Sequence, residues 1–264
     1  AAGHSDYIRI ERKIDPLLLK LNSEGYLNGH TPFSALLAFV SAAASILYGR
    51  KYIALSNENS ANEGSAFFSG IEINHQYSKS FEVEKYLHDY IRKFVSRDTY
   101  YFSFLRPLSE LKIAELFSRY KNHFSSFRSC NAGSKENKWC LKCPKCLFTY
   151  IILSPFLPDA ELTGIFGRDL FEEKELEPLL YELCGMKGIK PFECVGTLRE
   201  VNAALKKKIS LYNNGPLPYL LQRYKDRTGT AVTAAGDTFG DILRGYSDKN
   251  LLPDAFTKVL TENL

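Results

Sequence analysis

The sequence lacks a segment that could carry the chain into or across a membrane. Its longest apolar stretch, residues 33–48, is shorter than the roughly 18 to 20 apolar residues that a spanning helix needs. No secretory signal peptide is visible at its start. We therefore expect a cytoplasmic protein with no membrane partner.

A strong excess of one charge is also missing. The 34 lysines and arginines are interspersed with 30 aspartates and glutamates, which gives a net charge of +4. Because a nucleic-acid partner requires a basic stripe or patch, we do not expect one, whereas an acidic small molecule is a plausible partner. The only methionine is Met186 and the sequence begins with Ala1, so we expect a processed chain or a fragment.

Cysteines are too few for a scaffold held by disulfides, but four of the six lie close together. The spacing Cys130-x9-Cys140-x2-Cys143-x2-Cys146 supplies the four thiolates of a closed, structural zinc site in a reducing compartment. Two other interpretations of the sequence remain open, namely buried or redox-active thiols and an iron–sulfur cluster.

Predicted strands and helices alternate in the region before the cysteines. Residues 33–48 predict a helix that is apolar nearly all round and therefore buried, and residues 80–95 predict a helix with one apolar stripe. Residues 52–55 and 100–105 have the pattern of short strands, and residues 108–120 return to helix. This alternation predicts an α/β fold with a doubly wound parallel sheet, in which ligands bind at the carboxyl ends of the strands.

The sequence changes character beyond the cysteines. We expect residues 1–158 to form a partial α/β domain that carries the zinc site, and residues 159–264 to form a smaller, mainly helical carboxyl-terminal region. Within the second region, Thr197 and Glu200 have the spacing of a capping box that opens a helix. Residues 228–237 are small and polar enough to predict a mobile loop.

Three polar clusters lie where a parallel sheet would bind a ligand. Residues 56–64 follow the first predicted strand and hold two glutamates and three asparagines, and residues 28–31 and 74–79 precede predicted helices. Turn chemistry alone is the alternative explanation for such clusters. The candidate substrate-binding residues are Asn28, Ser56, Asn57, Asn62, Asn74 and Ser78.

Several single side chains could carry chemistry or hold an anion. His30 and His75 could act as general bases or bind phosphate, because imidazole titrates near neutral pH. Lys79 and Arg106 could hold a phosphate or a carboxylate. Cys194 precedes a predicted helix, whose dipole would stabilise a thiolate. The alternatives are a structural histidine, a surface ion pair and a buried inert cysteine.

Six segments between residues 15 and 205 carry a family resemblance. They are NGHTPFS at 28–34, ALSNE at 54–58, NHQYSKS at 74–80, FSFLRP at 102–107, CLKCPKCLF at 140–148 and PFECVGT at 191–197. Together they resemble the MurL family of ATP-dependent UDP-N-acetylmuramoyl-L-alanyl-L-glutamate epimerases.

The resemblance implies that the terminal L-glutamate of a UDP-muramoyl dipeptide is converted to D-glutamate for peptidoglycan synthesis. ATP and Mg²⁺ would convert the glutamyl carboxylate to an acyl-adenylate, with release of pyrophosphate, and hydrolysis would later release AMP. Inversion at Cα needs one mobile base or two opposed acid–base groups. The candidates for these groups are His30, His75, Glu58, Glu63 and Cys194, and Lys79 and Arg106 would hold anionic groups of the substrate.

A more distant resemblance connects the chain with PP-loop ATP pyrophosphatases such as cyano-deazaguanine synthases. It implies a PP-loop ATPase-like sheet and a phosphate-binding Ser-Gly-Gly-x-Asp-Ser loop. Because this loop is absent from the sequence, we expect it to lie in an amino-terminal part that precedes residue 1. The rival functions are a PP-loop adenylating enzyme that acts on a nucleobase or tRNA and a noncatalytic zinc-bearing binding module. The oligomeric state has no signature in the sequence.

Overall fold

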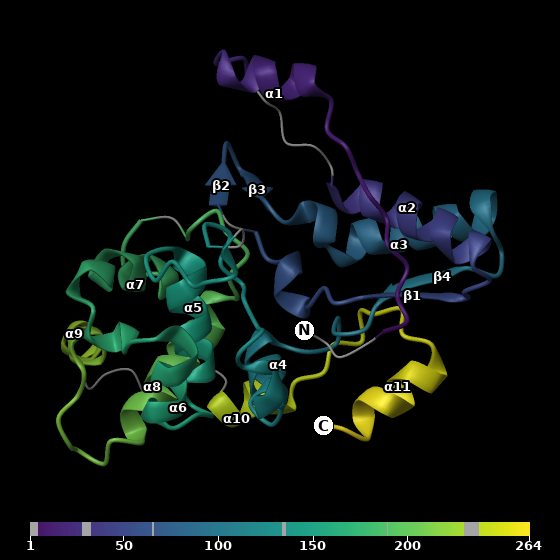
Figure 1. Ribbon diagram of the computed structural model, residues 1–264. Coiled ribbons are helices and arrows are strands. Elements are labelled where there is room, and N and C mark those ends of the chain that lie inside the picture. Colours follow the sequence, from purple (N-terminus) through teal and green to yellow (C-terminus); the bar gives the residue numbers. More distant parts are fainter. Residues whose placement is uncertain (1–4, 28–32, 65, 134–135, 189, 230–237) are drawn as a thin grey trace.

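The computed structural model describes residues 5–27, 33–64, 66–133, 136–188, 190–229 and 238–264. Over these residues the protein is mixed α/β, with a small sheet and its helices in the amino-terminal part and a cluster of helices in most of the remainder (Figure 1). Within the described ranges, no helix combines the length and apolarity that crossing a bilayer requires.

The amino-terminal part is organised around two parallel strands, β1 (Tyr52–Leu55) and β4 (Tyr100–Ser103). Helix α2 (Phe33–Leu47) precedes β1 and packs on it, and α3 (Phe81–Tyr90) precedes β4 and packs on that strand. The predicted order of helix and strand is therefore confirmed here. Because the strands are parallel, the loops that follow both of them emerge at the same edge.

The carboxyl-terminal helix α11 (Asp254–Thr261) returns to this small sheet (Figure 1). The ring of Phe256 lies with its centroid 4.9 Å from those of both Tyr52 and Phe102, one on each strand. The end of the described chain is therefore attached to its amino-terminal part by an aromatic cluster, which no local sequence pattern predicted.

The sheet is smaller than the doubly wound sheet that the sequence pattern predicts. The described residues form only the β1–β4 pair and a separate antiparallel pair, β2 (Ala66–Phe68) and β3 (Ile71–Ile73). The second pair is a hairpin closed by Ser69 and Gly70, whose φ angles of 50° and 79° are those of a tight two-residue turn. The sequence analysis missed this hairpin because each of its strands has three residues.

The prediction that the helix at residues 33–48 is buried is wrong for most of its surface. Only Ala38, Ala42 and Ser45 of α2 are buried, whereas Phe39 is 43% exposed and Leu47 is 81% exposed. The physical reason is that α2 lies on one side of a narrow sheet, which covers one stripe of the helix. The preceding helix α1 (Pro16–Ser23) buries no residue at all.

Helices dominate the rest of the described chain, and α5 lies at the centre of their core. Every residue of α5 from Cys146 to Leu153 is buried. One hydrophobic cluster runs from Leu111 to Ile242 and thus includes residues on both sides of the predicted boundary after residue 158, which stays a prediction. The helices are α4 (Glu110–Phe117), α5 (Pro144–Leu153), α6 (Asp159–Phe166), α7 (Glu177–Leu183), α8 (Leu198–Ser210), α9 (Tyr219–Thr228) and α10 (Phe239–Arg244).

Short helical turns connect these elements. They are the 3₁₀ turns η1 (Asn59–Asn62), η2 (Tyr77–Lys79), η4 (Lys121–His123), η6 (Leu170–Glu172) and η7 (Lys174–Leu176), and the π-helical turn η3 (Ile91–Val95) that extends α3. The predicted loop at residues 228–237 lies almost entirely outside the described residues.

The helix caps confirm the local predictions. The Thr197 hydroxyl accepts a hydrogen bond from the Glu200 amide at 3.1 Å, and the Glu200 carboxylate accepts one from the Thr197 amide at 2.9 Å. This is the predicted capping box, and it opens α8. Ser80 likewise caps α3 by accepting a hydrogen bond from the amide of Val83.

A buried ion pair lies at the carboxyl end of β4. The Arg106 side chain is 0% exposed, and its guanidinium donates to the Glu84 carboxylate at 2.7 and 3.1 Å. It also donates to the backbone carbonyls of Glu58, at 2.7 Å, and Lys79, at 2.6 Å. Glu84 in turn accepts a hydrogen bond from the amide of Ser103 in β4. One side chain therefore ties together β4, α3 and the loops that carry Glu58 and Lys79.

We expect Glu84→Gln to destabilise the protein by about 3 to 5 kcal/mol, because it leaves the charge of Arg106 buried without a counter-ion. The measurement is the free energy of unfolding from denaturant titration followed by circular dichroism. Asp89→Asn is the matched control, since it breaks the solvent-exposed Lys85–Asp89 pair on the same helix and removes the same charge. Equal decreases in the free energy of unfolding for the two variants would show that the buried ion pair contributes no more to stability than the exposed one.

Candidate functional site

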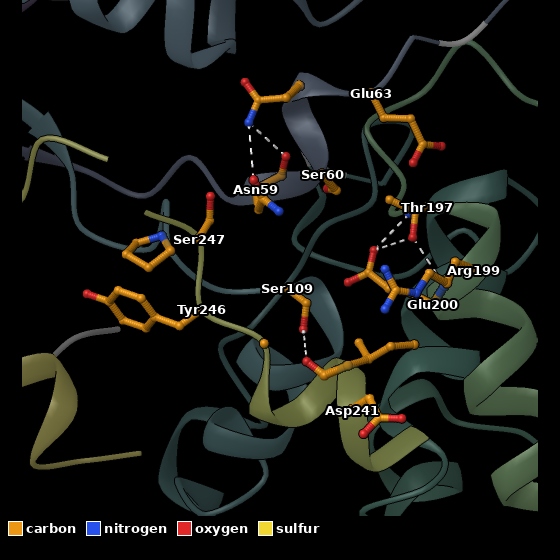
Figure 2. A pocket seen from close by; sticks show the side chains of 14 residues that line it. Asn59, Ser60, Glu63, Ser109, Thr197, Arg199, Glu200, Asp241, Tyr246 and Ser247 are labelled. Carbon is orange, nitrogen blue, oxygen red and sulfur yellow. Dashed lines mark hydrogen bonds between the residues drawn. The ribbon is translucent and has the colours of Figure 1, made fainter. Parts of the chain in front are cut away.

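A cavity of about 570 Å³ (Figure 2) is lined by parts of the segments that follow β1 and β4, and its volume is within the range of small-molecule sites. It lies between the turn η1, the start of α4 and the start of α8. Its lining residues are Asn59, Ser60, Asn62, Glu63, Pro107, Ser109, Thr197, Arg199, Glu200, Asp241, Ile242, Gly245, Tyr246 and Ser247.

The last five lining residues form a wall that the sequence analysis missed. This segment runs from α10 into the chain that follows it and lies far in sequence from the other lining residues. Its position is fixed by the Ser247 amide, which donates to the carbonyl of Pro107 at 2.9 Å, and by a 3.5 Å contact from the Ser109 hydroxyl to the carbonyl of Ile242. No motif in residues 241–247 indicated a site, because the segment acquires its place only through these long-range contacts.

The predicted polar loop after β1 contributes to the cavity through its second half. Asn62 and Glu63 line it, and the Asn62 amide group also shapes the loop by donating to the carbonyl of Asn59 at 3.0 Å. Asn57 donates to the hydroxyl of Ser103 at 3.1 Å and thus joins the ends of the two strands. Ser56 is exposed at the carboxyl end of β1 and does not line the cavity.

The second predicted cluster, residues 74–79, packs against the first. The side chain of Asn74 donates to the carbonyl of Ala61 at 2.9 Å and accepts a hydrogen bond from the amide of Gln76 at 2.7 Å. The hydroxyl of Ser78 lies 3.2 Å from that of Ser34 in α2. Both side chains hold the loops in place, and their assignment to substrate binding stays a prediction. The predicted substrate-binding residue Asn28 and the predicted acid–base residue His30 lie outside the described residues.

The fold brings Lys79 and Cys194 together, although 115 residues separate them. The Lys79 ammonium donates to the Cys194 sulfur at 3.1 Å. Arg106 fixes the backbone of Lys79, as described above, and its own guanidinium is bonded to protein groups on all three nitrogens. Arg106 therefore positions the site in this structure, and its direct contact with a substrate anion stays a prediction.

Glu110 is a further ionisable group that is influenced by Cys194 and Lys79. Burial raises the pKa of Glu110 well above its usual range, the nearby carboxylates of Glu58 and Glu200 and the sulfur of Cys194 raise it further, and only the ammonium of Lys79 opposes them. Glu58 and Cys194 were predicted from the sequence as candidate site residues, whereas Glu110 was not. The available signal was its position just after the carboxyl end of a predicted strand.

His75 lies beside the loop that carries Cys194. Burial lowers the pKa of its imidazole, a hydrogen bond with the Glu193 backbone opposes this, and the cations of Lys190 and Lys79 lower the pKa further. Its ring stands edge-on to that of Phe192, with centroids 6.0 Å apart. His75 is therefore neutral at pH 7 and able to accept a proton.

The four clustered cysteines have the geometry of a single-ion site. Sulfur–sulfur distances are 3.5 Å for Cys143–Cys146, 3.7 Å for Cys140–Cys146 and 3.8 Å for Cys130–Cys143. A tetrahedral zinc ion with bonds of about 2.3 Å separates its ligand sulfurs by about 3.8 Å, whereas a disulfide requires about 2.05 Å. The four thiols therefore fit Zn²⁺ and do not form disulfides.

The short distances between the four sulfurs argue against an iron–sulfur cluster. All four sulfurs lie within 4.8 Å of one another, which leaves room for one ion but not for several iron and sulfide ions. The amides of Gly133 and Cys140 point at the Cys130 sulfur from 3.2 and 3.4 Å, as in thiolate sites stabilised by the backbone. Among the described residues, this is the one group of three or more histidine, cysteine or acidic side chains arranged to hold a metal.

Residues next to the clustered cysteines contact the loop that carries Cys194. Cys143 caps α5, and Phe148 of this helix contacts Gly196 so closely that a Cβ at position 196 would lie 2.8 Å from the phenyl ring. Lys145, between two of the cysteines, donates to Asn131 at 3.1 Å and lies 4.0 Å from the carboxylate of Glu193. A zinc ion at the start of α5 would therefore fix the loop that presents Cys194.

Two family profiles match separate parts of the chain. Residues 1–104 match the family profile of the MurL N-terminal domain, and residues 125–229 match that of the MurL C-terminal domain. No solved structure matches the chain.

Three curated relatives bear the name UDP-N-acetyl-alpha-D-muramoyl-L-alanyl-L-glutamate epimerase. The protein of Salinispora tropica is 41% identical over 74% of this chain, that of a Micromonospora species 36% over 86%, and that of Xanthomonas oryzae pv. oryzae 38% over 75%. These matches cover 43%, 52% and 45% of the relatives, so the chain spans about half the length of the curated relatives that it matches.

We expect the purified protein to hold about one zinc ion per chain and Cys146→Ser to abolish its binding, because a tetrahedral structural site uses all four thiolates. Metal content is measured by mass spectrometry, together with the fluorescence of Trp139, which is next to Cys140 and packs on Phe166 at 4.5 Å. Since structural zinc contributes to folding, the variant also unfolds at a lower temperature.

Cys184→Ser is the control for this substitution, because Cys184 is also buried but lies outside the cluster. It should keep its zinc. Iron and sulfide in stoichiometric amounts, or zinc retained by Cys146→Ser, would contradict the assignment.

Proposed function

Because the chain belongs to the MurL family, we propose that it takes part in the epimerisation of the terminal L-glutamate of UDP-N-acetylmuramoyl-L-alanyl-L-glutamate to D-glutamate. The substrate follows from the name that three relatives share. The product is a precursor of peptidoglycan, and the need for ATP places the reaction in the cytoplasm.

The observation that carries the proposal is the group of ionisable side chains near Cys194. Inversion of a glutamyl centre requires the Cα proton to leave and another proton to arrive at the opposite face. Lys79 contacts the Cys194 sulfur, and the charges of Glu58 and Cys194 raise the pKa of Glu110. A noncatalytic binding module does not require carboxyl groups that lie this close together.

Activation of the substrate explains why ATP and Mg²⁺ belong to the proposal. A Cα–H next to a free carboxylate is very weakly acidic, because its removal would place a second negative charge beside the first. Conversion of the carboxylate to an acyl-adenylate removes that charge, and Mg²⁺ neutralises the departing pyrophosphate. Hydrolysis after inversion releases AMP and the D-glutamyl product.

The parallel strands β1 and β4 support a PP-loop ATPase-like sheet for the complete protein. The segments that follow their carboxyl ends contribute Asn59 and Pro107 to the cavity lining, and open α/β sheets bind ligands at such ends. We assign Zn²⁺ to the cysteines as a structural ion. The division into residues 1–158 and 159–264 belongs to the same proposal.

The side chains divide into two roles in this proposal. Lys79 and Arg106 attract anionic groups of the substrate to the carboxyl edge of the β1–β4 sheet. The polar side chains around the cavity hold the uncharged parts of the substrate. The polar side chains are Asn28, Ser56, Asn57, Asn62, Asn74 and Ser78, and the candidate acid–base groups are His30, His75, Glu58, Glu63 and Cys194.

We expect the full-length protein, given ATP, Mg²⁺ and the L-glutamyl substrate, to release AMP and to form the D-glutamyl product. AMP is quantified by liquid chromatography, and the glutamate configuration is determined by chiral chromatography after hydrolysis. Omitting the UDP-muramoyl dipeptide is the control and should abolish AMP release. AMP formed only with a nucleobase or tRNA would favour the adenylating rival, and folded, zinc-loaded protein without AMP or inversion would reject the proposal.

We expect His75→Ala to retain exchange of the glutamyl Cα proton with deuterated solvent, at a rate reduced by no more than about tenfold, since a required base contributes about 10²- to 10⁴-fold. The physical reason is that His75 is bonded to the Glu193 backbone and packs on Phe192, so it supports the Cys194 loop. Nuclear magnetic resonance of the substrate measures the exchange. Complete loss of exchange in a folded His75→Ala protein would instead identify His75 as the base.

A further inference from the structure

Glu110 occupies a distinctive position next to the cavity. It is the first residue of α4, directly after Ser109, whose hydroxyl caps the helix by accepting a hydrogen bond from the amide of Lys112 at 3.1 Å. Ser109 itself lines the cavity, and the Glu110 side chain is partly buried behind it. The pKa of its carboxyl group is influenced electrostatically by Glu58, Glu200, Cys194 and Lys79.

The neighbouring Glu200 has several hydrogen-bond donors at its carboxylate. Its carboxylate accepts hydrogen bonds from the Thr197 amide at 2.9 Å, the Thr197 hydroxyl at 2.8 Å and the Leu111 amide at 3.2 Å. Such donors stabilise a carboxylate. Among the described residues, no group is found to donate a hydrogen bond to the carboxyl of Glu110. When two carboxyl groups lie close together, the one without donors retains the proton.

Cys194 approaches Glu110 from the loop before α8. A Cβ at position 196 would lie only 3.2 Å from Cγ of Glu110, so this loop packs directly against the glutamate. The Cys194 sulfur also accepts a hydrogen bond from the Lys79 ammonium, which can balance the charge of a thiolate. The two groups thus differ in their surroundings: the pKa of the Glu110 carboxyl is raised well above its usual range, and the Cys194 sulfur contacts a cation.

We propose that Cys194 and Glu110 are the two acid–base groups that invert the glutamyl Cα. This inference rests on the proposed function and deepens it. The Cys194 thiolate removes the Cα proton, so a C–H bond breaks and an S–H bond forms. The Glu110 carboxyl gives its proton to the opposite face, so its O–H bond breaks and a new C–H bond forms. Solvent then carries the thiol proton back to the Glu110 carboxylate, and in the reverse direction the roles exchange.

Glu58, Glu200 and Lys79 act as positioning residues in this scheme. The two carboxylates raise the pKa of Glu110, and the Lys79 ammonium donates a hydrogen bond to the Cys194 sulfur. The backbone positions of Glu58 and Lys79 are both fixed by Arg106. The buried ion pair at the end of β4 would therefore determine where Glu58 and Lys79 lie in the site.

The test uses solvent-deuterium exchange with the zinc-loaded full-length protein, ATP and Mg²⁺, started from the L-glutamyl and the D-glutamyl substrates in separate reactions. With Glu110→Gln, we expect inversion to fall by about 10²- to 10⁴-fold, while the L-substrate still acquires deuterium at Cα through Cys194 and keeps its configuration. The D-substrate should not exchange. With Cys194→Ser, the pattern should reverse, so that exchange survives only from the D-substrate.

Glu115→Gln is the matched control, because Glu115 lies in the same helix and pairs with Lys112 away from this cluster. It should invert the substrate like the unsubstituted protein. Inversion by Glu110→Gln within about threefold of that protein, or equal loss of exchange from both epimers, would overturn the inference, since a required acid–base group contributes at least about 10²-fold.

A second readout separates this inference from the proposed function. The infrared spectrum at pH 7 should contain a protonated-carboxyl band that Glu110→Gln removes and Glu115→Gln leaves in place. If the unsubstituted protein keeps this band but does not invert the substrate, the proposed function fails and the catalytic role of Glu110 fails with it. If inversion occurs but the band is absent, only the inference about Glu110 is overturned.

Discussion

The Arg106–Glu84 ion pair is the interaction on which the arrangement of the site depends. A guanidinium without any exposed surface must find a partner for each of its nitrogens inside the protein, because an unpaired buried charge is very costly. Glu84 supplies the opposite charge, and the carbonyls of Glu58 and Lys79 supply the remaining acceptors. The loops after β1 and before α3 therefore meet at one point, and their backbones cannot move independently.

The cysteine cluster provides a second constraint on the arrangement of the site. It stands at the beginning of α5, the most deeply buried helix, and the close contact between Phe148 and Gly196 connects that helix to the Cys194 loop. One constraint fixes Lys79 and the other fixes Cys194, so the 3.1 Å contact between the two side chains is a consequence of both. Neither constraint alone would place them together.

The resulting site brings cations and carboxyl groups close together. Lys79 contacts the Cys194 sulfur at 3.1 Å, and Lys190 reaches Glu63 at 3.4 Å. Glu200 accepts three hydrogen bonds, whereas burial and the charges of nearby groups raise the pKa of Glu110. This environment is a property of the assembled fold, because it is formed by groups from distant segments of the chain.

Features that depend on neighbours in sequence were determined by the sequence itself. The capping box of Thr197 and Glu200, the Ser80 cap, the strands at residues 52–55 and 100–103, and the spacing of the four cysteines all follow from interactions within a few residues. The family likeness also rests on short continuous segments, so it too could be predicted.

Tertiary structure alone decided which face of α2 is covered, that residues 241–247 wall the cavity, and that Glu110 belongs to the site. Each of these depends on groups brought together from distant parts of the chain, and burial and charge act through space, not along the sequence.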